Sequence, residues 1–302
     1  MSPAGARWFP TLTDADLGRT RAPPNTLEVE PGRRVAFDLL GPEDGRPCFW
    51  FHGSPSGRFE GILLSELARR RGHRFILTDR PGLGRSDPRP GWSMMDVAAD
   101  AVRLADHLGY ERFSVAGGSG GGPFVLALAA HAPGRVRRAV ALACAGAFEL
   151  EEVGHAAGWV DALAARVARA PALLEVGFAL GLTPFARLPR PLAWAGGRLL
   201  SPSGDPRLPE LLSRTLRESL RGGVRGLVED TRVLHRPWAV PLASIRVPIT
   251  LVHGTADGFV GMTYGSALTS RIPRAHLLPA PGDGHFETIF DLERLDRLLS
   301  DG

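Results

Sequence analysis

The stretch Phe113-Ser-Val-Ala-Gly-Gly-Ser-Gly-Gly-Gly-Pro-Phe124 predicts a strand, a tight turn and a helix in immediate succession. An aromatic and β-branched run ends in six small residues, and an apolar run with helical character extends from Phe124 to His131. Gly117-Gly-Ser-Gly-Gly121 fits the pattern G-x-S-x-G, whose glycines let the backbone turn sharply enough to hold the central serine outward. Ser119 is therefore the candidate nucleophile.

A glycine-rich turn between a strand and a helix can also bind phosphate. The dinucleotide spacing G-x-G-x-x-G, counted from Gly118, requires glycine or alanine at position 123, where Pro123 stands. A P-loop requires G-K-[ST], and the sequence contains no lysine, which also excludes Schiff-base chemistry and lysine-dependent phosphoryl transfer. For the pentapeptide alone a plain tight turn remains open, and the partner residues found further along the chain favour the nucleophile.

The composition is that of a globular protein. The chain has 302 residues, 44% of them hydrophobic, which suits one large α/β domain or two smaller ones. Cys48 and Cys144 fall in strand-like apolar runs, where a free thiol acts as a small core residue. Residues 1–10 lack an apolar stretch of signal-peptide length, and no run approaches the roughly 18 to 20 apolar residues of a membrane span. We therefore expect a soluble protein of the reducing cytoplasm without a membrane partner.

The basic residues are scattered. The formal net charge is +4, and all 36 basic residues are arginines interspersed with 32 acidic ones. The densest clusters, Arg69–Arg71 and Arg135–Arg138, lie near expected helix ends or turns, where cations complement the helix dipole and stay solvated. We expect no nucleic-acid partner.

Strands and helices alternate along the chain. Short strands over 27–30 and 33–40 are separated by Pro31-Gly32 and should pair antiparallel. Further strands are expected over 48–51 and 75–78, in the run that leads into the Ser119 turn, and over 136–145, 248–252 and 276–278. Helices are expected over 57–71, 94–108, 124–131 and up to Leu299. This alternation predicts an α/β fold whose mostly parallel central sheet has helices on both faces.

The pattern changes between about Phe148 and Val240. This region has no strand-like run and is rich in Ala, Leu, Arg and Pro. Leucines at 208, 212, 216 and 220 and Val224 recur every four residues, which predicts a long amphipathic helix weakened at Gly222-Gly223. The region is therefore expected to be a helical insertion.

Five short motifs follow expected strands: His52-Gly-Ser-Pro55, Asp79-Arg-Pro-Gly-Leu-Gly-Arg-Ser86, Gly117-Gly-Ser-Gly-Gly121, His253-Gly-Thr-Ala-Asp257 and Gly284-His-Phe286. Together they resemble the α/β-hydrolase fold superfamily, specifically its lidded serine hydrolases, over residues 26–300. The resemblance implies an α/β-hydrolase fold with a catalytic core of residues 1–147 and 241–302 and a helical lid, or cap, of residues 148–240. The serine at position 119 argues against epoxide hydrolases and haloalkane dehalogenases, which have an acidic nucleophile there.

Within this resemblance the chain order Ser, Asp, His selects Ser119, Asp257 and His285 as the catalytic triad. Among nine histidines only His285 follows the last strand, in a glycine-flanked loop that can reach the serine. Asp283 is the rival acid, but it stands two residues from His285 and would have to fold back along its own loop.

An acyl-transfer enzyme must also stabilise the oxyanion of its tetrahedral intermediate. Gly120 supplies one backbone N–H group, and the resemblance implies that Ser54 supplies the second, with its hydroxyl as a further candidate donor. His52 and Gly53 should line the substrate site beside them. Arg58 could bind a substrate carboxylate, although a pair with a neighbouring acid such as Asp79 is the commoner outcome.

The aromatic residues of the insertion should contribute to an apolar pocket above Ser119. The candidates for substrate contact are Trp159, Phe178 and Trp194. The histidines lack paired metal-ligand spacing, so we expect neither a metal nor a cofactor.

The sequence thus predicts a carboxylesterase-like serine hydrolase that cleaves an ester, thioester or amide of a small, mostly apolar molecule. Two alternatives remain open: the same triad used for acyl transfer, cyclisation or lyase chemistry, and a ligand-binding receptor with a vestigial site. The oligomeric state is also open, a homodimer included.

Overall fold

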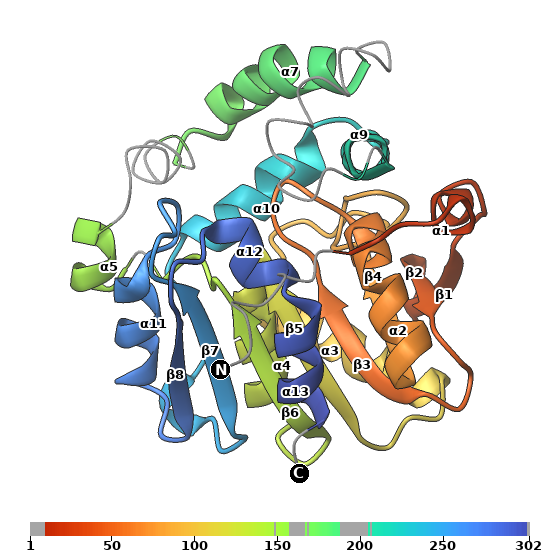
Figure 1. Cartoon of the computed structure of the whole chain (residues 1–302). Coiled ribbons are helices and arrows are strands. Elements are labelled where there is room, and N and C mark those ends of the chain that lie inside the picture. Colours follow the sequence, from red (N-terminus) through yellow and green to blue (C-terminus); the bar gives the residue numbers. More distant parts are fainter. Residues whose placement is uncertain are drawn as a thin grey trace.

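The structure is a computed structural model that describes residues 10–147, 149–156, 169–187 and 207–300, together with residues 167 and 205. Its centre is an eight-stranded sheet in the order β1-β2-β4-β3-β5-β6-β7-β8 (Figure 1). The strands are β1 (Asn25–Glu30), β2 (Arg33–Leu40), β3 (Arg46–Phe51), β4 (His73–Thr78), β5 (Phe113–Gly118), β6 (Val136–Leu142), β7 (Ile249–Gly254) and β8 (Ala275–Ala280).

The sheet is mostly parallel. β2 pairs antiparallel with β1 and with β4, and every other pairing of neighbours is parallel. The α/β-hydrolase architecture and the antiparallel opening pair predicted from the sequence are both confirmed. β6 ends at Leu142, three residues earlier than predicted, and Ala143 turns away with a φ of +46°.

Helices cover both faces of the sheet. On one face lie α3 (Met94–His107) and α4 (Gly122–His131), and on the other lie α2 (Ser65–Arg71) and α13 (Leu292–Ser300). The remaining core helices are α1 (Asp14–Arg19), α11 (Met262–Thr269) and α12 (His285–Phe290), with short 3₁₀ turns η1 (Arg58–Leu64), η2 (Ser119–Gly121) and η3 (Leu242–Ser244). α3 begins at a capping box, in which the Asp96 N–H donates to the Ser93 hydroxyl and the Ser93 N–H donates to the Asp96 carboxylate. The helix starts at Met94, as predicted.

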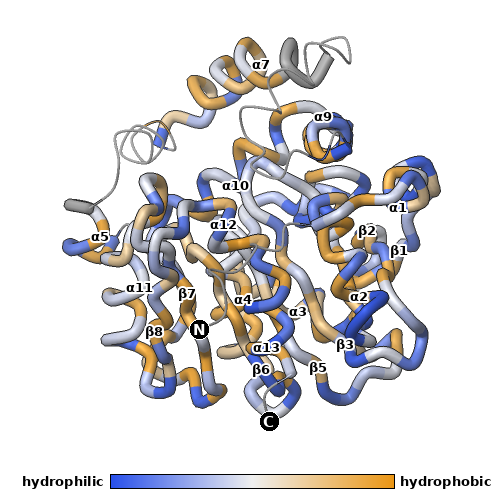
Figure 2. Tube along the Cα trace, in the orientation of Figure 1, coloured by the Kyte–Doolittle hydropathy of each residue, from blue (hydrophilic) through white to orange (hydrophobic). Residues whose placement is uncertain are grey.

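The core is built from apolar strand residues. Figure 2 shows hydrophobic residues running through the strands and hydrophilic residues gathering in outer turns and helix surfaces. Four buried rings form successive contacts at centroid distances of 5.0 to 6.5 Å, in the order Phe113, Phe49, Phe51, Phe124. This cluster connects β3 and β5 with the start of α4, and so supports the turn that carries Ser119.

Two predicted helices are divided. Residues 57–71 form η1 followed by α2, and η1 passes so close to β4 that a Cβ atom at Gly61 would lie 2.3 Å from Leu77. The long helix predicted from residue 208 is α9 (Arg207–Ser219) followed by α10 (Arg225–His235). Gly223 between them has a φ of +90°, a left-handed conformation that ends a helix.

The described part of the inserted region contains only helices: α5 (Glu151–Ala156), α7 (Pro171–Arg187), α9 and α10. In Figure 1, α7, α9 and α10 lie above the sheet, on the side of the carboxyl end of β5. They therefore lie on the side of the sheet where the sequence motifs follow the strands.

Candidate active site

Ser119 stands at a sharp turn between β5 and α4. Its φ of +52° is one of three positive values at non-glycine residues in the described chain. A Cβ atom at Gly121 would lie 2.0 Å from the carbonyl oxygen of Phe51, and one at Gly118 would lie 2.6 Å from Ile289. The glycines are required because the turn is pressed against the β3 backbone and α12, and this leaves Ser119 projecting at the end of the strand.

His285 and Asp257 form a hydrogen-bonded pair. His285 is the first residue of α12, and its Nδ1 lies 2.8 Å from Oδ2 of Asp257, which follows β7. The other carboxylate oxygen of Asp257 accepts the backbone N–H groups of Phe259 and Val260 at 2.8 and 2.9 Å. Burial raises the pKa of Asp257, but the hydrogen bond and charge of His285 and the two N–H donors outweigh burial and hold this pKa below its ordinary value. Asp257 is thus an anion that can hold the Nδ1 proton of His285 and leave Nε2 as the acceptor.

Ser119 and His285 line the same cavity, which has a volume of about 620 Å³. The structure therefore brings the three predicted triad residues to one site.

The rival residues have other partners. Asp283 is bound to Arg294 at 2.7 Å. His52 is buried, its Nδ1 lies 2.8 Å from the carbonyl oxygen of Gly53, and burial together with the Arg80 charge lowers its pKa well below the ordinary value. Burial lowers the pKa of His253 to about 4. The prediction that His52 lines the substrate site is therefore corrected, because this side chain is buried and does not belong to the described lining of the cavity.

Gly120 and Ser54 lie side by side next to Ser119. A Cβ atom at Gly120 would be 3.3 Å from the backbone nitrogen of Ser54, and one at Gly53 would be 3.6 Å from Cβ of Ser119. The two residues predicted to supply the oxyanion donors therefore lie beside each other and beside the serine. The hydroxyl of Ser54 donates to Asp230 at 2.7 Å, so it is already engaged.

Three residues that the sequence reasoning did not single out support this loop. Glu60 accepts the N–H of Gly53 with both oxygens at 3.0 Å, and burial raises the pKa of this carboxyl. Arg80 donates to the carbonyl oxygens of His52 and Gly53 and pairs with Asp230. Arg80 belongs to the motif after β4, so the sequence marked its region; nothing in the sequence marked Glu60 or Asp230.

Arg58 is a structural residue. Its guanidinium, 1% exposed, pairs with Asp79 at 2.5 Å, with Asp38 at 2.9 Å and with Glu218 at 3.2 Å. The expected pair with a neighbouring loop acid is present, and Arg58 has no free face for a substrate carboxylate.

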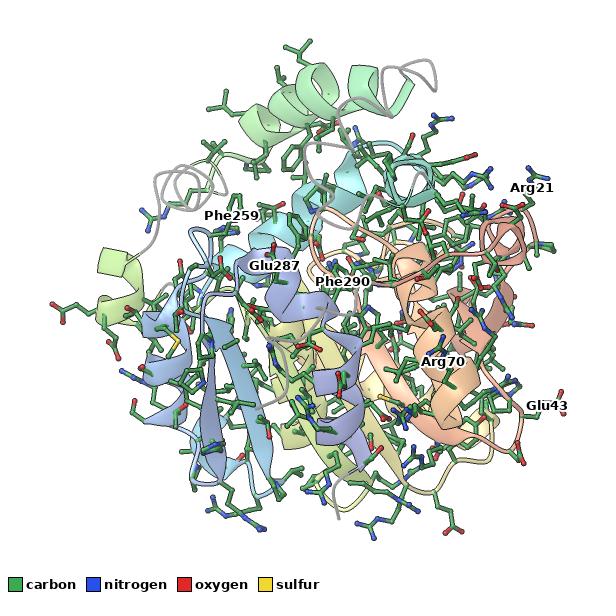
Figure 3. All side chains as sticks on the ribbon, in the orientation of Figure 1. Arg21, Glu43, Arg70, Phe259, Glu287 and Phe290 are labelled. Atoms are coloured by element: carbon green, nitrogen blue, oxygen red, sulfur yellow. The ribbon has the colours of Figure 1, made fainter. Side chains whose placement is uncertain are left out.

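Helices of the insertion supply much of the cavity wall. Phe178 of α7, Leu212 and Leu216 of α9 and Leu227 and Leu234 of α10 contribute apolar surface. On the core side Phe259, labelled in Figure 3, lies on the loop below α7, and its ring meets the His285 ring edge-on at 5.5 Å. Trp159 and Trp194 lie outside the described residues.

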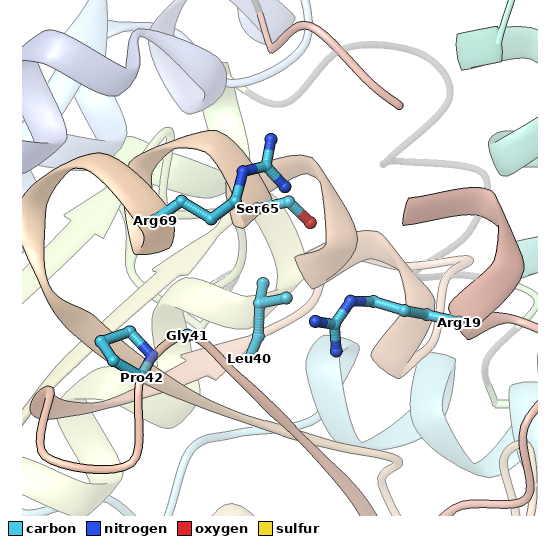
Figure 4. Close-up of a pocket in the computed structure, with 6 residues that line it drawn as sticks. All are labelled: Arg19, Leu40, Gly41, Pro42, Ser65 and Arg69. Carbon is cyan, nitrogen blue, oxygen red and sulfur yellow. The ribbon is translucent and has the colours of Figure 1, made fainter. Parts of the chain in front are cut away.

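A second pocket lies away from the cavity, on the surface between α1 and α2. It has a volume of about 290 Å³ and contains the arginines Arg19 and Arg69 and the side chain of Ser65 (Figure 4). Arg69 donates to Asp16 at 2.9 Å, so its charge is balanced within the protein. The described lining holds no base beside a nucleophile, so the larger cavity is the candidate active site.

The described residues contain neither a metal-ligand cluster nor a membrane-spanning helix. No group of three or more metal-ligating side chains is present among them. None of the helices described is long and apolar enough to cross a membrane.

Comparison with known proteins identifies relatives. A family profile described as alpha/beta hydrolase fold matches residues 50–291. The AB hydrolase superfamily protein YisY of Bacillus subtilis is 26% identical over 265 residues, which cover 85% of this chain and 91% of YisY. A proline iminopeptidase of Xanthomonas citri is 34% identical over 127 residues, which cover 40% of this chain and only 37% of that enzyme.

Among solved structures, the esterase RhEst1 of Rhodococcus sp. superposes with a TM-score of 0.65 at 22% identity, covering 93% of this chain and 100% of the esterase. At this identity the likeness shows a common fold.

Proposed function

The chain belongs to the α/β-hydrolase fold family, and on this premise we propose that it is a serine hydrolase that cleaves an ester, thioester or amide through an acyl-enzyme on Ser119. Carboxylester hydrolysis is its primary activity. The observation that carries the proposal is that His285, which is hydrogen-bonded to Asp257, lines one cavity with a serine held at a strained turn.

The chemistry follows from the geometry. His285 takes the proton of the Ser119 hydroxyl while the oxygen attacks the carbonyl carbon, and the carbonyl π electrons move onto oxygen. The N–H groups of Gly120 and Ser54 stabilise that oxyanion. The intermediate then collapses, the leaving group takes the proton from His285, and water repeats the sequence to release the acid and regenerate Ser119. Asp257 stays ionised throughout and stabilises the His285 cation.

The substrate is small and mostly apolar. A cavity of about 620 Å³ lies within the range of small-molecule sites, and its wall from α7, α9 and α10 is dominated by Phe and Leu side chains. We propose that residues 148–240 act as a lid on a catalytic core of 1–147 and 241–302, and that Trp159 and Trp194 join Phe178 in substrate contact. The buried free thiols of Cys48 and Cys144 support a reducing cytoplasmic location.

The relatives' names include an esterase and a proline iminopeptidase. The peptidase match spans little more than a third of that enzyme, and the likeness to the esterase shows the fold alone. The choice of a carboxylester therefore rests on the apolar cavity beside Ser119. An acyl-transfer reaction with the same triad is the alternative, and mass balance on the products separates the two, since only hydrolysis releases the free acid.

The test is hydrolysis of p-nitrophenyl esters of graded acyl length by the wild type and by Ser119→Ala. The wild type should turn over, the variant should not, and a fluorophosphonate should label Ser119 alone. The variant should keep its melting temperature because a side chain at the cavity surface is trimmed and no core cavity opens. Equal turnover by the two proteins would overturn the proposal.

A further inference from the structure

Helix α10 reaches the oxyanion loop through a buried ion pair. Asp230, in the middle of α10, receives Nε and Nη2 of Arg80 at 2.6 and 2.9 Å. Both side chains are fully buried. The two residues are 150 positions apart in the chain, so the pair joins the inserted region to the loop after β4.

The same two side chains hold three consecutive residues of the oxyanion loop. Arg80 donates to the carbonyl oxygens of His52 at 2.6 Å and Gly53 at 2.9 Å. Asp230 accepts the hydroxyl of Ser54 at 2.7 Å. The loop is therefore attached to α10 through one guanidinium and one carboxylate.

These contacts fix the direction of the Ser54 N–H group. The Gly53 carbonyl and the Ser54 N–H belong to one planar trans peptide unit, in which the C=O and N–H bonds point in opposite directions. Because Arg80 holds the Gly53 oxygen on one side, the Ser54 N–H must point to the other. Gly120 lies close to this group, because its Cβ position is 3.3 Å from the Ser54 nitrogen.

We propose that Asp230 and Arg80 are positioning residues of the oxyanion hole, and that α10 uses them to aim the Ser54 N–H at the developing oxyanion. The inference rests on the proposed serine hydrolase function. Thr231 and Leu234 of the same helix line the cavity. A substrate in the cavity therefore contacts the helix that orients the Ser54 N–H group. The substrate site and the oxyanion hole are thus coupled through one side chain.

The test compares Asp230→Asn with Asp100→Asn. Asp100 also receives two guanidinium nitrogens of a buried arginine, Arg33, at 2.6 and 2.8 Å, and it makes no contact with the loop. Both exchanges weaken a buried pair and should lower the melting temperature. Removing an oxyanion donor costs about 10²–10³ in kcat, so Asp230→Asn should lower kcat by about 10- to 10³-fold with KM changed little. Asp100→Asn should keep kcat within about threefold.

A transition-state analogue provides the second readout. A trifluoromethyl ketone forms an oxyanion on Ser119, whereas the neutral alcohol product does not. Asp230→Asn should lower the affinity for the ketone by the same factor as it lowers kcat, and it should change the affinity for the product by less than about threefold. Asp230→Glu should recover part of the loss, and Ser54→Ala, which removes only the hydroxyl contact, gives a folded protein with a smaller loss if Asp230→Asn fails to fold.

Hydrogen exchange separates failure of this inference from failure of the proposed function. In the ligand-free protein, Asp230→Asn should accelerate exchange of the amides over 52–57 relative to those of β5, and Asp100→Asn should not. This measurement needs no activity. Unchanged exchange at the loop, or a folded Asp230→Asn enzyme with wild-type kcat, would overturn the inference. An active Ser119→Ala protein would overturn the proposed function instead.

Discussion

Replacing Asp257 by asparagine changes one oxygen to an NH₂ group, and the structure determines which. One carboxylate oxygen accepts two backbone N–H groups, from Phe259 and Val260, and only an oxygen can do so. The asparagine NH₂ must therefore occupy the other position, 2.8 Å from Nδ1 of His285. It donates there, which forces the His285 proton onto Nε2, and that nitrogen can no longer take the Ser119 proton.

The expected loss is large. The corresponding exchange in a serine protease triad lowers kcat by about 10⁴, or about 5.5 kcal/mol of transition-state stabilisation. We expect a loss of similar size in kcat on p-nitrophenyl esters, with a folded protein because every backbone donor keeps its acceptor. Asp283→Asn is the matched control. It weakens the ion pair with Arg294 and should keep kcat within about threefold.

The result that refutes this reasoning is specific. An Asp257→Asn enzyme that retains a tenth of wild-type kcat would show that Asp257 does not set the tautomer of His285. A greater loss in Asp283→Asn would transfer the role of the acid to Asp283.

Three further predictions concern pH, backbone packing and selectivity. Burial lowers the pKa of His253 to about 4, so between about pH 6.5 and 4 the unfolded chain binds a proton that the folded chain does not. The free energy of unfolding should therefore decrease by up to about 3 kcal/mol as the pH is lowered through this range, and urea titrations of His253→Gln should lack this decrease. Gly121→Ala places a methyl group 2.0 Å from the Phe51 oxygen and should lower both the melting temperature and ester turnover, whereas Gly134→Ala meets nothing within 4 Å and should change neither. Leu234→Ala removes a side chain that reaches within 3.1 Å of the Gly120 Cβ position and should raise kcat/KM for bulky acyl groups several-fold relative to acetyl; an unchanged ratio would show that the acyl group lies elsewhere.

Local sequence signals predicted the core of the fold well. The glycines around Ser119 and the Pro31-Gly32 turn each act within a few residues, so their effect could be inferred without the rest of the chain. The division of the helix after residue 208 was indicated by Gly222-Gly223, but periodicity alone could not show that two helices form there.

Contacts between residues far apart in the chain could not be predicted from the sequence. Asp230 meets Arg80 across 150 positions and Ser54 across 176, and an aspartate on a helix surface is ordinarily solvated. Glu60 was missed for a similar reason, because it follows the loop in a segment that read as an ordinary helix. Ser54 was identified for its backbone, and only the structure shows that its hydroxyl is engaged by Asp230.

The φ of +52° at Ser119 sets stability against activity in the evolution of this position. A left-handed conformation costs a residue with a Cβ atom roughly 1–2 kcal/mol, a large share of the roughly 5–15 kcal/mol that keeps a domain folded. Glycine carries no such penalty, so Ser119→Gly should unfold at a higher temperature than Ser119→Ala while being equally inactive. Selection for stability alone thus favours glycine at this position. Only continued selection for turnover retains the serine, and a lineage released from that selection should lose its nucleophile early.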